Sequence, residues 1–369
     1  LRRGGAAAFL PGGGAPRAGD RGAQPALAET LGRIARHGAR GFYEGAVAAD
    51  MVATLRARGG LHTEADFAAC RTASAFVEPL RARWRGVDVW QCPPNGQGLL
   101  VLMLLRILGG MESAPDGPLG PIRFHRHLEA ARLVYRDRDA LLADPAQADV
   151  PVARLLDPAY LDGLRRLIRD DAVMQAMPQP GVALLPRHRD TTYLCVVDRD
   201  GNACSLINSL FQGFGSGILA PRSGVMLHNR GFGFRLEPGH PNCIAPNKRP
   251  MHTIIPGMVT QNGRAVMPFG VMGGHFQPMG QTLFLTNLLE YGLGIQTSVD
   301  WPRAFTTGRR TELERGVPEA VARALTKLGH AVETVEKPHG GGQAIWIDHT
   351  RGVLIGGSDP RKDGLAMGY

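Results

Sequence analysis

Residues 187–209 read RHRDTTYLCVVDRDGNACSLINS and contain the clearest structural signal in the chain. The apolar run YLCVV is followed by the turn-forming residues DRDGN and then by a second run, ACSLI. Asp, Gly and Asn between two such runs are typical of a β-hairpin. The first strand begins on two hydroxyl residues, Thr191 and Thr192, directly after Asp190. Threonine is common in strands, so the pair alone indicates no more than a strand start.

The pattern of apolar residues changes at this hairpin, from helical spacing before it to short strand-like runs after it. Between residues 26 and 169, apolar residues recur mainly at helical spacing, as in ALAETLGRIARHG and LLVLMLLRILGG, and RWRGVDVWQCPP alternates as a strand. After residue 191, short apolar runs are broken by Gly, Asn and Asp, and TQNGRA and DHTRGV are hairpin signals. A helical half followed by a strand-rich half predicts layers of sheet covered by helices.

Composition limits the classes of function. The 369 residues carry a formal charge of +9, but the basic residues are mostly scattered arginines, without a basic run interleaved with aromatics. We therefore expect no nucleic-acid partner. No apolar stretch reaches the roughly 18 residues that a membrane span needs, so we expect no membrane partner. The localisation is left unknown; without a visible signal peptide the cytoplasm is favoured, although the chain opens on Leu1 in a Gly- and Pro-rich stretch and we expect further sequence upstream.

The residues that bind metals and cofactors show no recognisable spacing. The five cysteines form no CxxC pair, the histidines form no HExxH motif, and no phosphate-binding glycine loop is present. His125 and His127 lie two apart, on different sides of an expected helix, which indicates structural or solvated residues rather than ligands. We expect neither a metal nor a cofactor.

A threonine hydroxyl is a poor nucleophile unless a base lies beside it. The free α-amine of the same threonine can be that base, provided that the threonine is the first residue of its chain. An internal threonine reaches this state when its hydroxyl attacks the preceding carbonyl and the resulting ester is hydrolysed. Such a site also needs donors for an oxyanion, and Gly273-Gly274 in FGVMGGHFQP offers two unobstructed backbone N–H groups. A glycine pair alone is equally typical of a tight strand-to-helix turn.

Several segments together resemble one known family. DTTYLCVVDRDGNACSLINSLFQGFGSGI, NKRP, MGGHFQPMGQ and GGSDPRKDGLAMGY are similar, in order and spacing, to the small subunit of the γ-glutamyltranspeptidase family. GFYEG, WRGVDVWQCPPNGQG and EAARLVYRDRDALLADP resemble the later part of its large subunit. Members of this family are N-terminal-nucleophile (Ntn) hydrolases, which are made as one precursor that cleaves itself.

The resemblance implies an α+β fold, a four-layer αββα sandwich with two mainly antiparallel sheets. It implies a cut between Asp190 and Thr191, with residues 1–190 as the later, mostly helical part of a large subunit and residues 191–369 as the small subunit. Thr191 matches the nucleophile. Ser209 matches a hydroxyl residue thought to assist processing, and Gly273 and Gly274 match the oxyanion-binding pair.

The substrate pocket departs from the family pattern. Where the family grips the amino and carboxylate groups of a γ-glutamyl substrate, this chain has Phe211, then HNRGFGF without an acidic residue, then His252 and Thr253. Arg230, within HNRGFGF, brings positive charge instead. Either Arg230 pairs with a substrate carboxylate or it is a loop arginine facing solvent. His252 is either a pocket residue or a structural histidine. The pattern HTIIPG…MGG…QPMGQ is more similar to oxamate-amidohydrolase relatives.

We therefore expect a self-processing amidohydrolase or acyltransferase of the γ-glutamyltransferase type, a glutathione hydrolase-like enzyme acting on a small-molecule amide. An oxamate-like amidohydrolase with a non-glutamyl substrate is the first alternative. A catalytically inactive, truncated member serving as a binding partner is the second, because no segment here matches the early part of the large subunit, which supplies an arginine for the substrate carboxylate. The large and small subunits of one precursor are the expected partners, and a homo-oligomer remains open.

Overall fold

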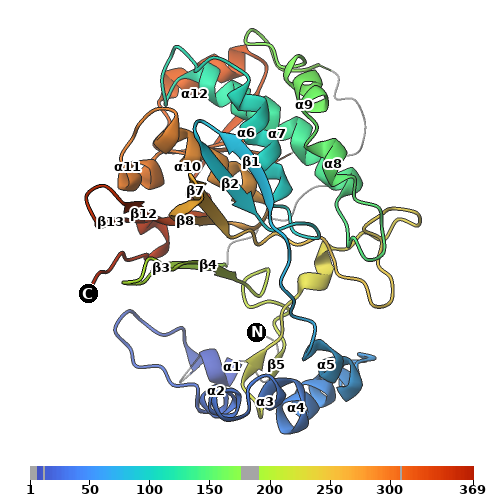
Figure 1. The fold of residues 1–369 in the computed structure, drawn as a ribbon. Helices are drawn as coiled ribbons and strands as arrows, with labels where there is room; N and C mark the ends of the chain where they lie inside the picture. Colours follow the sequence, from blue (N-terminus) through green and yellow to red (C-terminus); the bar gives the residue numbers. More distant parts are fainter. Residues whose placement is uncertain (1–5, 11–12, 176–190, 308–309) are drawn as a thin grey trace. The chain divides into compact units, whose positions relative to one another are not determined.

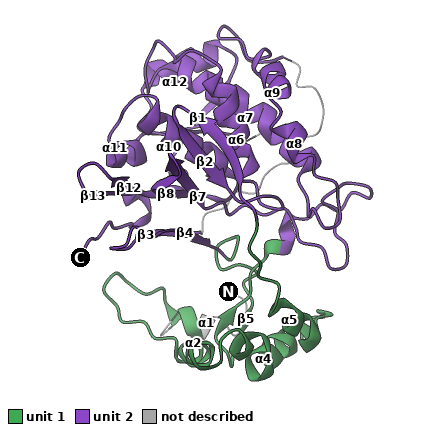
Figure 2. Cartoon of the chain, viewed as in Figure 1, with its two compact units in different colours: residues 1–77, 210–230 green, residues 78–209, 231–369 purple. Residues whose placement is uncertain are grey.

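The computed structural model describes residues 6–10, 13–175, 191–307 and 310–369. They form two compact units (Figure 2), unit 1 from residues 1–77 and 210–230 and unit 2 from residues 78–209 and 231–369. Both predicted subunit segments, 1–190 and 191–369, contribute to each unit. The cut predicted after residue 190 would divide the chain covalently, but it does not coincide with a boundary between the two units.

A six-stranded sheet forms the centre of unit 2 (Figure 1). Each neighbouring pair of its strands is antiparallel. The stretch predicted as one strand, RWRGVDVWQCPP, is a hairpin of two strands, because Arg85 and Gly86 form a turn with positive φ. In spatial order the strands are β1 (Leu80–Trp84), β2 (Val87–Gln91), β7 (Gly257–Gln261), β8 (Arg264–Met272), β12 (Gly341–Asp348) and β13 (Val353–Ser358).

Helices cover one face of this sheet (Figure 1). The alternating residues Met267, Phe269 and Val271 of β8 belong to the hydrophobic core that the sheet shares with the helices. The LLVLMLLRILG segment predicted as a helix is apolar on nearly all sides because this layer buries it almost completely. The covering helices are α6 (Leu99–Gly109), α7 (Pro121–Leu141) and α10 (Gln277–Leu289).

The predicted hairpin of residues 191–209 is confirmed as β3 (Thr192–Val197) and β4 (Ala203–Asn208). It packs on the face of β8 opposite to the one that the helices cover. Gly270 and Met272 of β8 lie on this face, and Met267, Phe269 and Val271 lie on the other. Tyr193 and Ile207 of the hairpin contact Met272, and the ring of Tyr193 lies against Gly270. A mixed α and β fold with antiparallel sheets is therefore confirmed. The described layers are helices, the six-stranded sheet and the hairpin, and the four-layer arrangement stays a prediction.

Smaller elements complete unit 2. Strands β9 and β10 are antiparallel, whereas β10 and β11 are parallel and are joined by helix α12. Two further short helices follow α7, and one follows α10. The bounds are α8 (Val152–Leu155), α9 (Pro158–Arg165), α11 (Ile295–Asp300), β9 (Ala304–Thr307), β10 (Arg310–Glu314), α12 (Glu319–Lys327) and β11 (Ala331–Val335).

Unit 1 is a small helical body with one two-stranded sheet. Val47, Met51 and Ala220 form its core. Asp50 joins its two chain segments, since its carboxylate accepts the Ser223 hydroxyl and backbone N–H groups, each at 2.7 Å. The segment ALAETLGRIARHG, which has helical spacing, forms most of α2, and this helix ends at Gly38, whose φ is 59°. The elements are α1 (Ala6–Phe9), α2 (Pro25–His37), α3 (Arg40–Tyr43), α4 (Gly45–Arg56), α5 (Glu64–Cys70), β5 (Leu219–Ala220) and β6 (Val225–Met226).

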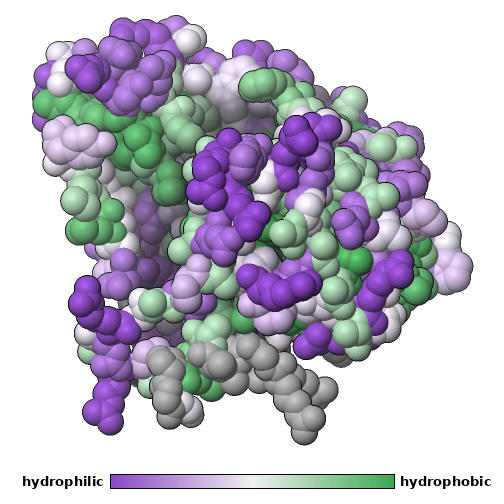
Figure 3. Space-filling view, turned by 90° about the horizontal axis from the view of Figure 1, so that it is seen from below, coloured by the Kyte–Doolittle hydropathy of each residue, from purple (hydrophilic) through white to green (hydrophobic). Residues whose placement is uncertain are grey.

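The surface mixes polar and apolar side chains. Strongly hydrophilic residues lie next to hydrophobic ones over the face drawn in Figure 3. Among the described helices, none combines the length and the apolar character required to cross a bilayer.

Candidate active site

Thr191 and Ser209 lie directly beyond the last residue pair at one end of the β3–β4 hairpin. Thr192 pairs with Asn208 in the antiparallel register, and continuing that register by one residue sets Thr191 opposite Ser209. Thr191 is half-buried. The backbone N–H of Ser209 donates to Oδ1 of Asn208 at 2.7 Å, which fixes the chain direction where the strand ends. Asp190, the other side of the predicted cut, lies outside the described residues.

Hydrogen bonds hold this hairpin on strand β8. The hydroxyl groups of Tyr193 and Ser205 are 2.8 Å apart, and Ser205 also donates to the carbonyl oxygen of Phe269 at 3.2 Å. Burial raises the pKa of Tyr193 well above its usual value, so this phenol stays protonated and remains a hydrogen-bond donor. The hairpin that begins at Thr191 is therefore attached to the strand that ends just before the glycine pair.

Gly273 and Gly274 form the turn between β8 and a single 3₁₀ turn that leads into α10. Their φ angles are 120° and 59°, in the region that favours glycine. A Cβ atom at Gly273 would also lie 3.0 Å from Cα of Gly340. Both the backbone conformation and the close approach of Gly340 therefore require glycine at this turn. The glycine pair alone predicts no more than a tight strand-to-helix turn, and the structure contains that turn. The oxyanion-binding role of Gly273 and Gly274 stays a prediction.

Three consecutive carbonyl groups of this turn each accept a hydrogen bond. The oxygen of Gly273 accepts from the backbone N–H of Phe276 at 3.1 Å. The oxygen of Gly274 accepts from the side-chain amide of Gln97 at 2.9 Å, and that of His275 accepts from the Tyr135 hydroxyl at 2.5 Å. Because the C=O of one residue and the N–H of the next point in opposite directions in a trans peptide, these bonds also fix the N–H directions of Gly274, His275 and Phe276.

His252 and Thr253 are joined to the glycine turn through Gln97. The Gln97 backbone N–H donates to the carbonyl oxygen of His252 at 3.0 Å, and its side-chain amide donates to that of Thr253 at 3.0 Å. Thr253 is buried, and Nδ1 of the half-buried His252 lies 3.4 Å from the backbone nitrogen of Ile254. Two of the predicted segments, His252-Thr253 and Gly273-Gly274, are therefore brought together.

Gln97 and its partner Arg138 were not singled out from the sequence. Nη1 of Arg138 donates to Oε1 of Gln97 at 3.1 Å and to Nδ1 of His275 at 3.0 Å. Arg138 is itself neutralised by Asp139 at 2.6 Å, and its guanidinium lies 4.6 Å from the centre of the Tyr135 ring. Gln97 lies in the segment CPPNGQG, whose residues predict only a turn before a helix. The one feature of the sequence that could have drawn attention to Gln97 is that this segment resembles the family.

Phe211 and Arg230 lie in unit 1, where the guanidinium of Arg230 stacks over the Phe211 ring at 4.5 Å. Arg230 is only 6% exposed, so the alternative of a solvent-facing loop arginine is wrong. Burial lowers its pKa to about 10, which still leaves it charged at neutral pH. Phe211 has a φ of 83°, an uncommon conformation for a bulky residue that often marks a constrained site.

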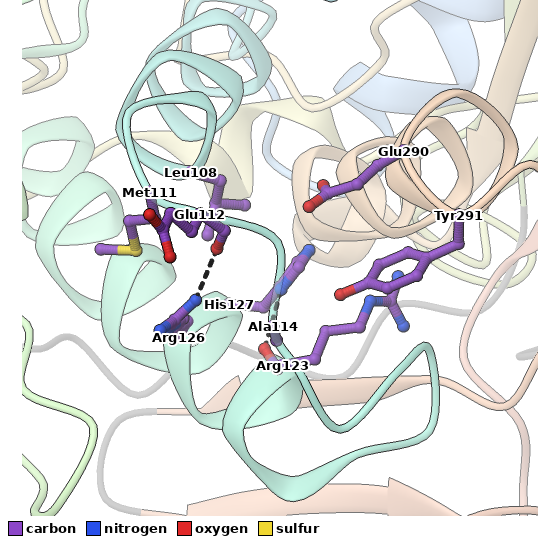
Figure 4. A pocket seen from close by; sticks show the side chains of 9 residues that line it. All are labelled: Leu108, Met111, Glu112, Ala114, Arg123, Arg126, His127, Glu290 and Tyr291. Carbon is purple, nitrogen blue, oxygen red and sulfur yellow. Dashed lines mark hydrogen bonds between the residues drawn. The ribbon is translucent and has the colours of Figure 1, made fainter.

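A separate pocket lies between α6, α7 and the end of α10 (Figure 4). Its cavity volume is about 20 Å³, which is room for one water molecule rather than a substrate. Nη2 of Arg123 bonds Oδ1 of Asn287 at 2.6 Å, and Nη1 of Arg126 bonds the carbonyl oxygen of Glu112 at 2.7 Å. We regard this pocket as structural. In the part of the chain that the structure describes, no group of three or more His, Cys, Asp or Glu residues is arranged to hold a metal ion.

Comparisons with known proteins identify the family of the chain. The family model described as gamma-glutamyltranspeptidase matches residues 2–369. A glutathione hydrolase-like proenzyme of Bacillus subtilis is 37% identical, over 98% of this chain and 68% of its own length. An oxamate amidohydrolase proenzyme of Klebsiella pneumoniae is 36% identical, with the same coverage of both chains.

The fold is also similar to that of a solved enzyme. The crystal structure of a cephalosporin acylase from Bacillus halodurans superposes with a TM-score of 0.90 at 37% identity, covering 99% of this chain and 67% of that one. The chain thus spans about two thirds of the length of these relatives. Their names include three different amide substrates, and similarity at this level of identity does not choose among them.

Proposed function

Because the chain belongs to the γ-glutamyltranspeptidase family of self-processing amidohydrolases, we propose that it cuts itself before Thr191 and then hydrolyses small amides with Thr191 as the nucleophile. The observation that carries this proposal is the register of the hairpin. Continued by one residue beyond its last pair, Thr192–Asn208, this register sets Thr191 opposite Ser209 on a hairpin attached to β8, the strand that leads into Gly273 and Gly274.

Processing is the first reaction of the proposed sequence. The Thr191 hydroxyl attacks the carbonyl of Asp190, the Thr191 nitrogen leaves as the amine, and an ester joins the two residues. Water then cleaves that ester, which leaves a carboxylate on Asp190 and a free amine and hydroxyl on Thr191. Ser209, opposite Thr191 in the register, assists proton transfer in this step.

Amide hydrolysis follows the same chemistry. The α-amine of Thr191 takes the hydroxyl proton while the oxygen attacks the substrate carbonyl, and the N–H groups of Gly273 and Gly274 stabilise the oxyanion. The proton passes to the leaving amine as the C–N bond breaks. Water attacks the resulting acyl-enzyme, releases the acid and restores the hydroxyl. When an amine takes the place of water, the products are those of a transferase.

For the substrate, we favour an acyl group that carries a carboxylate and lacks an α-amino group. In the HNRGFGF segment the sequence has Arg230 in place of the acidic residues of the family, and a guanidinium is suited to bind a carboxylate. The HNRGFGF segment contains no acidic residue to bind an ammonium group. The oxamate amidohydrolase relative is named for an anionic amide without an amino group, whereas the glutathione hydrolase-like relative favours the γ-glutamyl alternative.

The intact mass of the purified protein under denaturing conditions tests the processing step. We expect two fragments, the smaller one beginning at Thr191. Thr191→Ala should stay whole, while Thr191→Ser, which keeps a hydroxyl, should still be cut. An uncut wild-type chain, repeated on a version extended upstream, would support the alternative of an inactive family member.

A matched pair of substrates tests the acyl preference. γ-Glutamyl-p-nitroanilide and glutaryl-p-nitroanilide differ only by the α-amino group, so their kcat/KM ratio reports whether the enzyme binds that ammonium. We expect the glutaryl compound to be favoured by about 10-fold or more, with oxamate assayed in parallel by ammonia release. Preference for the γ-glutamyl compound would instead assign the protein to the glutathione hydrolase type.

A further inference from the structure

Gln97 is completely buried, and both of its side-chain amide hydrogens and its side-chain oxygen take part in hydrogen bonds. Its two amide hydrogens go to the carbonyl oxygens of Thr253 and Gly274, at 3.0 and 2.9 Å, and its oxygen accepts from Arg138 at 3.1 Å. The opposite amide orientation would set oxygen against two carbonyl oxygens, so the assignment is determined by its surroundings. Glutamine is therefore the natural side chain that meets this set of partners.

The bond to Gly274 acts on the orientation of the glycine turn. Phe276 holds the carbonyl of Gly273 on one side of the Gly274 Cα, and Gln97, together with the backbone N–H of Gln277, holds the carbonyl of Gly274 on the other. With both flanking peptide planes fixed, the φ of 59° at Gly274 is maintained without any side chain of its own. Glycine is the most flexible residue, so a turn of two glycines needs such external support to keep its N–H groups aimed in one direction.

Arg138 extends the same support from helix α7. One nitrogen, Nη1, bonds both Gln97 Oε1 and His275 Nδ1, so the side chains of residues 97 and 275 share one donor group. Because Nδ1 of His275 accepts this bond, the ring carries its proton on Nε2. The glycine turn is thus supported by residues from the loop before α6 and from α7, both of which precede residue 191 in the chain.

We propose that Gln97 is a positioning residue that holds the oxyanion-binding turn in its active conformation and couples it to the His252-Thr253 segment. This inference rests on the proposed function. Gln97 contacts the carbonyl sides of the peptides, so it acts through Gly274 rather than on the substrate. Its loss should therefore lower kcat far more than it changes KM, because a misdirected oxyanion donor weakens binding of the transition state.

The test compares Gln97→Met and Gln97→Glu with Gln281→Met. Gln281 is a matched control because it is also fully buried and also donates to a backbone carbonyl, that of Ile255 at 2.6 Å, and its oxygen accepts from Gln91 at 2.7 Å rather than from a group of the glycine turn. We expect kcat to fall about 10- to 100-fold in both Gln97 variants, with KM within about 3-fold of wild type, and kcat within about 3-fold in the control. Gln97→Glu has nearly the same volume as the wild-type side chain. If Gln97→Met does not fold, kcat and KM can still be measured on Gln97→Glu.

Amide hydrogen exchange of the peptide that covers residues 273–279 gives a readout independent of catalysis. We expect exchange there to be at least about 10-fold faster in the Gln97 variants than in the Gln281 variant. Equal kcat losses in all variants, or unchanged exchange of this peptide, would overturn the positioning role. If wild type shows no turnover that depends on Thr191, the proposed function fails, and the exchange result alone decides whether Gln97 holds the turn.

Discussion

The ring of Tyr193 lies directly against the backbone of Gly270, so closely that a Cβ atom at Gly270 would be 2.5 Å from Cδ2 of the ring. Tyr193 is two residues after the proposed nucleophile, and Gly270 is three residues before Gly273. The contact therefore sets the spacing between β3, which begins directly after Thr191, and β8, which leads to the glycine turn.

Gly270→Ala should disturb both stability and processing. The added methyl group cannot fit without moving the Tyr193 ring, and overpacking of this kind costs about 1–3 kcal/mol. Because the ring is part of the nucleophile hairpin, we expect slower self-cleavage as well, measured as the fraction of uncut chain over time after purification. Gly163→Ala is the control, since Gly163 lies within α9 with no atom near its added Cβ and should be neutral or slightly stabilising. Normal cleavage in Gly270→Ala would contradict the proposed coupling.

Ser209 should govern the rate of processing. Its hydroxyl stands opposite Thr191 in the register, where it can take part in proton transfer during the ester shift. We expect Ser209→Ala to slow the appearance of the fragment that begins at Thr191 by at least about 10-fold, and Ser209→Thr, which keeps the hydroxyl, to process at close to the wild-type rate. Equal rates in the two variants would remove Ser209 from the mechanism.

Arg230 should determine preference for an anionic acyl group. Arg230→Gln removes the buried charge, so kcat/KM for glutaryl-p-nitroanilide should fall by about 10-fold or more, while an amide with an uncharged acyl group changes little. Arg21→Gln, at an exposed position of unit 1, controls for loss of one positive charge. A parallel loss on both substrates would indicate that Arg230 supports the structure through Phe211 instead.

The free energy of unfolding should decrease in acid because His125 and His330 form a buried hydrogen-bonded pair. His125 Nε2 lies 2.6 Å from the carbonyl oxygen of Arg169, so it carries the proton, and His125 Nδ1 therefore accepts from Nε2 of His330 at 2.8 Å. Burial first, then the nearby His125 and Arg132, lowers the pKa of His330 to about 3. The unfolded chain takes up this proton near pH 6.5 and the folded chain does not, so stability falls as the pH drops from about 6.5 towards 3.

Urea unfolding at pH 7 and pH 5 measures this effect. His330→Gln can still donate to His125 but does not titrate, so we expect a smaller difference between its two midpoints than in wild type. His37→Gln, at an exposed position on α2, should leave the wild-type difference intact. An unchanged pH dependence in His330→Gln would assign the acid sensitivity to other groups, such as the buried His127, whose pKa burial also lowers to about 3.

Much of the fold could be predicted because its signals are local. The DRDGN turn and the Asn-Gly of TQNGRA each specify a hairpin through residues that tolerate positive φ, and α6 ends at a glycine pair as its pattern indicates. The turn at Arg85 was missed since arginine is not a typical residue there. The split of unit 1 between residues 1–77 and 210–230 depends on the long-range bonds of Asp50, which periodicity does not report.

The candidate site was predictable only in part for a related reason. Thr191, Ser209 and the glycine pair could be named because a motif carries them. Gln97 and Arg138 could not, because their importance lies in contacts with residues more than 130 positions away. Gln97 donates to the backbone carbonyl of Gly274 and Arg138 donates to the imidazole of His275, and no local sequence pattern reports either contact. Arg230 was located, but its burial is a property of the folded unit.

The central sheet has a consequence for the proposed cut. Strand β2 comes before residue 191 and strand β7 after it, and the two are hydrogen-bonded neighbours from Asp88–Thr260 to Gln91–Gly257. The fragments produced at Thr191 would therefore share one continuous ladder and one hydrophobic core, so breaking the peptide bond would release neither of them. Pulling them apart would require opening the middle of the sheet, and fragment exchange between molecules should be as slow as global unfolding.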